Sequence, residues 1–237
     1  MIQLRQEKIP LHKSMIKLLS VADIVTLLNA VLGFLALLLV FSHQLHLAAS
    51  LILLGLLADG LDGMIARRLG NGQIGGYLEP LADMISLSVA PLVLLYMTYY
   101  DFFASGFSTH LIVGIVLVFS LICSVIRLSS FSLLKQERFF IGLPTSASAL
   151  FLVAASYLKT ELWVVLPIIV ILSFAMISSI RFPKPGVKVN IIIAVFIIVT
   201  LVLDGMYSNV APLLLLAGLV VYIVIGPFFL YGKKKEG

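Results

Sequence analysis

The chain reads DGLDGMIARR from Asp59 to Arg68 and GGYLEPLAD from Gly75 to Asp83, and the rest of the sequence is organised around this acidic stretch. Its four carboxylates lie within strongly apolar sequence, because the Leu-rich run 45–57 precedes them and a second apolar run follows them. An ionisable side chain inside a membrane costs ~2.5–3.5 kcal/mol on insertion scales. Four such side chains close together in the sequence therefore indicate a functional site.

The spacing of the four acids predicts that they face one another. Asp59 and Asp62 are three residues apart, so they share one face of a helix. Glu79 and Asp83 are four residues apart and also share a face. Two such helices side by side would bring four carboxylates together, and hard divalent cations prefer oxygen ligands of this kind. The sequence therefore predicts a metal site formed by both pairs.

Composition identifies the class of protein. Of the 237 residues, 61% are hydrophobic and 11% are charged, and the mean hydropathy is +1.17. Since about a quarter of the residues of a soluble domain are charged, we predict an integral membrane protein. The single cysteine, Cys123, excludes an internal disulfide and a Cys-based zinc site. The net charge of +5 comes from basic residues scattered between apolar segments, so we expect no nucleic-acid partner.

The hydrophobic pattern predicts an all-α membrane domain over residues 21–237, with about eight transmembrane helices. These helices are expected at about 21–42, 45–69, 75–99, 110–134, 144–158, 161–180, 189–204 and 210–231. Residues 1–20 mix basic and apolar side chains, which predicts a short amphipathic helix lying in the membrane interface after Pro10. A disordered basic leader is the alternative for this segment.

The distribution of basic residues predicts the orientation in the cell membrane. If the N-terminus is cytoplasmic, Lys159 is the one outer residue among the 16 Lys and Arg, as the positive-inside rule requires. Both termini and the four acids are then cytoplasmic, and the acids lie one to three helical turns from the boundary. A polar chamber open to the cytoplasm fits this placement better than a pore. The acidic motif is not repeated, which argues against an inverted-repeat transporter. A transporter coupled to divalent cations or protons remains the alternative from another class.

The acidic stretch resembles the signature of the CDP-alcohol phosphatidyltransferases. That signature is written D-x2-D-G-x2-A-R, then roughly seven or eight residues, then G-x3-D-x3-D. Here it runs from Asp59 to Arg67, resumes after seven residues at Gly75, and ends at Asp83. Seven of its eight fixed positions agree. The exception is Glu79, which replaces an aspartate but keeps its charge and donor type.

The resemblance implies an activity and a set of site residues. Enzymes of this family move a phosphatidyl group from a CDP-linked lipid to an alcohol and release CMP. By analogy, two Mg²⁺ or Mn²⁺ ions would be held by Asp59, Asp62, Glu79 and Asp83. Asp83 would also act as the general base. The nucleotide-binding positions of the family correspond to Gly63, Ala66, Arg67 and Gly75, and Arg67 is expected to bind phosphate.

Three polar residues outside the signature are further candidates for substrate binding. Thr26 and Asn29 lie near the inner end of the first predicted helix, where they could donate hydrogen bonds to the nucleotide or to a neighbouring helix. Arg127 is an inner-side arginine that could contact the substrate phosphate or the serine carboxylate. Alternatively, it could anchor its helix at the membrane boundary.

Four further stretches resemble the phosphatidylserine synthase branch of the family. They are residues 22–33, 126–131, 140–145 and 176–183. This resemblance implies L-serine as the acceptor and a phosphatidyl or archaetidyl donor. Transfer to inositol phosphate or glycerol phosphate is the alternative within the family. The family also implies membrane lipids as neighbours and a homodimer.

Overall fold

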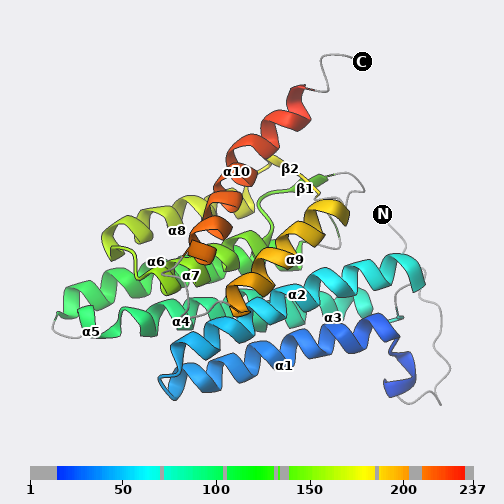
Figure 1. The fold of residues 1–237 in the computed structure, drawn as a ribbon, viewed down its shortest axis with the longest axis horizontal. Helices are drawn as coiled ribbons and strands as arrows, with labels where there is room; N and C mark the ends of the chain where they lie inside the picture. Colours follow the sequence, from blue (N-terminus) through cyan, green and yellow to red (C-terminus); the bar gives the residue numbers. More distant parts are fainter. Residues whose placement is uncertain are drawn as a thin grey trace.

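The computed structural model describes residues 15–69, 72–103, 106–130, 133, 139–184, 187–202 and 210–232. These residues form a helical bundle that carries a short two-stranded ribbon (Figure 1). In chain order the elements are η1 (Met15–Leu18), α1 (Val21–Phe41), α2 (Leu45–Leu69), α3 (Gly75–Asp83), η2 (Met84–Val89), α4 (Ala90–Thr98), α5 (Tyr100–Phe103), α6 (Phe107–Ser129), β1 (Phe139–Ile141), α7 (Thr145–Leu158), α8 (Leu162–Ile177), β2 (Arg181–Pro183), α9 (Val187–Val202) and α10 (Val210–Gly232).

The helices agree with the hydrophobic pattern. Four of the described helices are long and apolar enough to cross a membrane: Val21–Phe41, Leu45–Ala66, Gly75–Thr98 and Phe107–Ser129. After these, the apolar stretches in the described part of the chain are shorter, at Thr145–Leu158, Leu162–Ile177, Asn190–Leu201 and Pro212–Pro227, so eight crossings remain a prediction. The largest difference from the predicted spans is at α6, which lies three residues earlier at its start and five earlier at its end than 110–134. The class of helical membrane protein is confirmed.

The N-terminal interfacial helix was predicted over residues 1–20, and residues 1–14 lie outside the described part of the chain. The described remainder begins with η1, one turn of 3₁₀ helix whose Met15 side chain is 83% exposed. Ser20 then caps α1, because its hydroxyl accepts from the Asp23 N–H while the Asp23 carboxylate accepts from the Ser20 N–H. The interfacial helix therefore stays a prediction.

Helix α1 turns its small and polar residues toward the protein. Thr26, Asn29 and Gly33 are on its buried side, whereas the large side chains of Ile24 and Phe34 are more than half exposed. A soluble protein shows the opposite arrangement, but in a bilayer the large apolar side chains can face lipid while small residues allow close helix packing. The outward apolar surface of α1 therefore supports the membrane assignment.

The third long helix contains a π-helical segment. Residues 75–98 form one continuous segment made of α3, the π-helix η2 and α4. Segment η2 contacts α1, α2, α4, α6 and α7, so it lies at the centre of the bundle. Its closest packing is against α1, because a Cβ atom added to Gly33 would lie 2.5 Å from the Cα of Ser86. π-turns of this kind are rare and often occur at functional sites.

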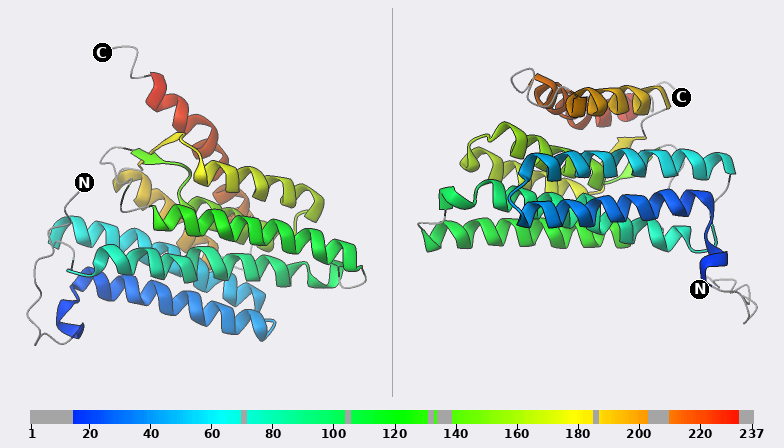
Figure 2. Two further views of the ribbon diagram at one scale, coloured as in Figure 1. Left: turned by 180° about the vertical axis from the view of Figure 1, so that it is seen from behind. Right: turned by 60° about the horizontal axis from the view of Figure 1, so that its bottom comes forward.

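The ribbon and the last two helices complete the fold. Strands β1 and β2 pair antiparallel, with Phe140 opposite Phe182, and add a short ribbon that the sequence did not predict to the mostly helical chain. Helix α7 is buried along most of its length among its neighbours. Helices α9 and α10 lie together on one side of the bundle (Figure 2).

Gly142, directly after β1, has a conformation that an L-residue adopts at a cost. Its φ is +76°, and an added Cβ would collide with the Met176 carbonyl oxygen. The left-handed conformation alone costs ~1–2 kcal/mol for a residue with a side chain. We therefore expect Gly142→Ala to lower the midpoint of thermal unfolding in detergent by several degrees. Gly114→Ala is the matched control, since a Cβ there meets nothing within 4 Å. Equal midpoints for the two variants would contradict this prediction.

Candidate active site

The four acids of the signature lie on two neighbouring elements of the bundle. Asp59 and Asp62 are on α2, and Glu79 and Asp83 are on α3. The Asp83 carboxylate interacts electrostatically with the other three, and the charges of Asp62 and Glu79 act on Asp59. Asp62 is buried, with 4% of its surface exposed, and the other three are half-buried. The structure thus brings together the four acids that the sequence predicted to face one another.

Helix α1 reaches this acid cluster with two hydrogen bonds. The Thr26 hydroxyl lies 2.5 Å from Oδ2 of Asp62, to which it donates, and the Asn29 amide donates to Oδ1 of Asp83 over 3.0 Å. The sequence left open whether these residues bind the nucleotide or bond between helices. In the structure they bond between helices, each to a different acidic helix.

The donor chemistry of the cluster fits Mg²⁺ or Mn²⁺, because it consists of carboxylate oxygens. Like charges close together also repel one another, and a bound cation would offset that repulsion. Among the residues that the structure describes, however, no three His, Cys, Asp or Glu side chains are gathered closely enough to hold an ion. The acids therefore share a region but do not form a finished coordination shell, and the metal site remains a prediction.

The space beside the acids is open. A Cβ added to Gly60, Gly63 or Gly76 would meet nothing within 4 Å. Gly60 and Gly63 alternate with the two acids of α2, and Gly76 lies in the first turn of α3. Bare backbone next to open space allows a bulky ligand to approach closely.

The predicted nucleotide-binding residues lie around the connection between α2 and α3. Gly63, Ala66 and Arg67 are in the last turns of α2, and Gly75 is the buried first residue of α3. The side chain of Arg67 lies outside the described part of the structure. The structure therefore places these positions at the same end of the two acidic helices, whereas their contacts to a nucleotide stay predictions.

Arg127 is buried inside the protein. Only 6% of its surface is exposed, and its Nε donates to the Leu143 carbonyl over 3.3 Å. This hydrogen bond connects α6 to the loop after β1, a contact that the boundary anchor considered from the sequence did not include. Its proposed contact with substrate is not tested by this bond.

The structure joins three of the branch-like stretches, which sequence reasoning did not foresee. Arg127 from stretch 126–131 bonds Leu143 of stretch 140–145. The Gly142 N–H donates to the Ile180 carbonyl over 2.8 Å, and the Leu143 N–H donates to Ala175 over 2.9 Å. The pairing of β1 with β2 continues this junction. Gly142 was the available signal, because its conformation permits the close approach of these segments.

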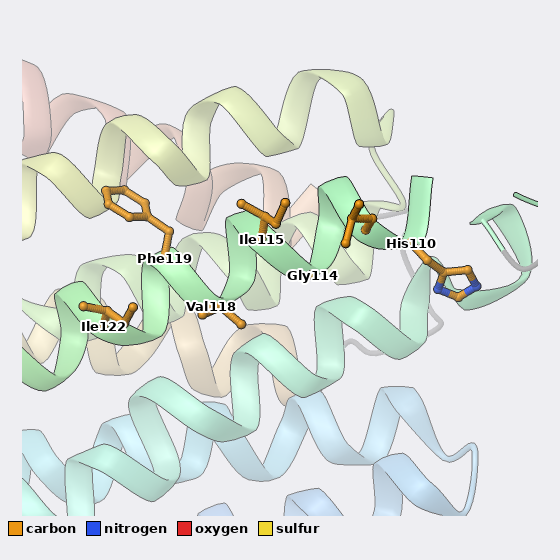
Figure 3. Close-up of a pocket in the computed structure, with 7 residues that line it drawn as sticks. His110, Gly114, Ile115, Val118, Phe119 and Ile122 are labelled. Carbon is orange, nitrogen blue, oxygen red and sulfur yellow. The ribbon is translucent and has the colours of Figure 1, made fainter. Parts of the chain in front are cut away.

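A separate groove runs along α6 and has no acidic lining (Figure 3). It is formed by apolar residues between His110 and Ile122, with Gly114 toward the His110 end. His110 lies at one end, where its Nδ1 is 3.3 Å from the Tyr96 hydroxyl. The groove therefore lacks the groups that phosphoryl transfer needs, and the acid cluster remains the candidate active site.

Comparison with known proteins identifies the family of the chain. The family model of the CDP-alcohol phosphatidyltransferases matches residues 19–225. The chain is 34% identical to a CDP-diacylglycerol–serine O-phosphatidyltransferase of Methanocaldococcus jannaschii, covering 75% of this chain and 80% of that protein. It is also 34% identical to an archaetidylserine synthase of Methanothermobacter thermautotrophicus, with 73% of each chain covered. A Bacillus subtilis CDP-diacylglycerol–serine O-phosphatidyltransferase is 32% identical over 67% of this chain and 87% of its own length. With its signature acids gathered on α2 and α3 and a family match over most of its length, this chain belongs to the CDP-alcohol phosphatidyltransferase family.

Proposed function

We propose that this protein transfers a phosphatidyl or archaetidyl group from a CDP-linked lipid to the hydroxyl of L-serine and releases CMP. The observation that carries the proposal is the acid cluster, whose signature carboxylates on α2 and α3 interact electrostatically with one another. The choice of serine is supported by relatives whose names specify serine transfer. The names of these relatives do not favour inositol phosphate, glycerol phosphate or transport.

In the proposed reaction the serine hydroxyl oxygen attacks the phosphorus that carries the lipid. A new P–O bond forms to serine, and the bond to the CMP oxygen breaks. Asp83 takes the hydroxyl proton, and Asn29 holds one oxygen of this carboxylate during the transfer. CMP leaves with the electron pair of the broken bond. The P–O bond formed, the P–O bond broken and the proton are thus all accounted for, and no atom changes its oxidation state.

Asp59, Asp62, Glu79 and Asp83 would hold the divalent cations, which when bound supply charge neutralisation at the diphosphate. The bare backbone at Gly63, together with Ala66 and Gly75, leaves room for the cytidine. Arg67 would pair with a phosphate through charge-assisted hydrogen bonds. Arg127 would reach the substrate phosphate or the serine carboxylate from α6. Helix α6 contacts η2, the segment that begins at the residue after Asp83.

We further propose that the site and both termini lie on the cytoplasmic side of the cell membrane and that the protein is a homodimer. The orientation is supported by the basic residues, of which Lys159 alone among 16 falls on the outer side. The dimer is supported by the family resemblance.

The acceptor prediction is tested by supplying purified protein with CDP-lipid, Mn²⁺ and one alcohol at a time while following CMP. L-serine is expected to support CMP release far better than inositol phosphate or glycerol phosphate. The control is CDP-lipid without any alcohol, which measures hydrolysis. A preference for either phosphorylated alcohol would move the protein to another branch of the family, and no release with any alcohol would refute the proposed function.

A further inference from the structure

Helix α1 carries no residue of the acidic signature, yet it bonds one acid from each of the two acidic helices. Thr26 and Asn29 are three residues apart, so they point to the same side of α1. One bonds Asp62 of α2 and the other bonds Asp83 of α3. We propose that Thr26 and Asn29 are positioning residues that set the direction of these two carboxylates. The inference rests on the proposed function, because it assigns work to the acids of that site.

The two hydrogen bonds restrict which oxygen each acid can offer. Thr26 takes Oδ2 of Asp62, and Asn29 takes Oδ1 of Asp83. A carboxylate held at one oxygen cannot rotate freely, so its other oxygen keeps one direction. Partners of this kind, which act through a metal ligand rather than on the metal, change metal affinity or activity ~10–100-fold when removed.

Burial favours positioning over direct binding of a ligand. Asn29 is 0% exposed and Thr26 is 5% exposed, and each already directs its donor at an acid. Within the described part of the chain, Oδ1 of Asn29 has no hydrogen-bond partner. A buried carbonyl oxygen without a partner is unfavourable for stability. An apolar residue would avoid that penalty but would supply no N–H donor to Asp83.

Two glycines bring α1 close enough for these short side chains to reach. A Cβ at Gly55, one turn before Asp59 on α2, would lie 3.0 Å from Oδ1 of Asn29. A Cβ at Gly33, one turn after Asn29, would overlap the backbone of Ser86 in η2. Helix α1 is therefore seated against both acidic elements at the level of Asn29.

The test combines Mn²⁺ binding without substrate, followed by electron paramagnetic resonance of the free ion, with turnover measurements. Thr26→Val keeps the shape but removes the hydroxyl, and we expect Mn²⁺ affinity to fall ~10–100-fold. Thr26→Ser keeps the hydroxyl and is expected to bind as the unmodified protein does. Thr200→Val is the matched control, because Thr200 is equally buried but donates to Phe196 of its own helix α9.

Asn29→Ala is expected to lower kcat ~10–100-fold while KM for the CDP-lipid changes only a few-fold. Asn29→Asp keeps the shape but places a second carboxylate against Asp83, and a similar loss of kcat is expected even if Asn29→Ala does not fold. A rise in KM alone, with Mn²⁺ binding and kcat unchanged, would make these residues nucleotide ligands and overturn the proposal. Equal Mn²⁺ affinities of Thr26→Ser and Thr26→Val would also overturn the proposal. Because Mn²⁺ binding needs no substrate, it tests positioning even if serine transfer is not the reaction.

Discussion

Asp83→Asn is expected to lower the rate of CMP release by ~10²–10⁴-fold, the usual contribution of a general base. Asparagine keeps the size of the side chain but cannot accept the serine proton. CDP-lipid and Mn²⁺ should still bind appreciably, because three other acids remain in the cluster. The measurement is calorimetric binding of CDP-lipid with Mn²⁺ beside turnover with L-serine.

Asp59→Asn provides the contrast, because the proposed role of Asp59 is coordination alone. This variant should weaken Mn²⁺ and nucleotide binding together as well as turnover. The roles assigned to the two acids are wrong if Asp83→Asn binds no nucleotide while Asp59→Asn binds it normally.

Removal of divalent cations is expected to abolish CMP release entirely. The reason is the clustering of carboxylates on α2 and α3, whose mutual repulsion and oxygen chemistry both favour a divalent cation. Activity should disappear as EDTA is titrated in and return when Mg²⁺ or Mn²⁺ is added in excess. EDTA already saturated with Mg²⁺ is the control for effects of the chelator itself. Full turnover in excess EDTA would exclude the metal.

Glu79 allows a finer test of the same cluster. Glu79→Asp restores the residue of the family signature while keeping the charge and the type of donor. We expect this variant to retain or exceed the original activity, whereas Glu79→Gln should lose much of it. If Glu79→Gln is as active as the unmodified protein, Glu79 is not a ligand.

Much of the fold could be predicted because long apolar runs interrupted by polar turns leave little choice of helix position. The bounds of α1 and α2 differ from the predicted ones by at most a residue. The meeting of the acid pairs could be predicted as well, since adjacent antiparallel helices bring residues near their shared connection to one depth. These features depend on local sequence and on the hydrophobicity that a bilayer requires, and both can be read from the sequence.

Other features depend on how helices are rotated about their axes, which the sequence does not record. Helix α1 is apolar on nearly every side, so periodicity could not show that Thr26 and Asn29 face the acids. The ribbon pairs segments of only three residues, and their partners lie more than thirty residues apart in the chain. The π-turn at η2 has no distinctive residues of its own. Each of these three features arises from tertiary packing and was found only in the structure.

The π-helix η2 allows one continuous helical segment to meet two packing requirements. On its N-terminal side Asp83 must face Asn29 of α1, whereas on its C-terminal side Leu94 and Leu95 are fully buried in the core and α4 packs against α7. In an α-helix each residue advances the rotation by about 100°, so one extra residue in a turn shifts everything after it by that amount. Deleting one residue from segment 84–89 would thus leave all other side chains unchanged. It would nevertheless turn either the carboxylates or the leucines away from their partners. Evolution along this segment is therefore expected to permit exchanges of side chain more readily than changes of length.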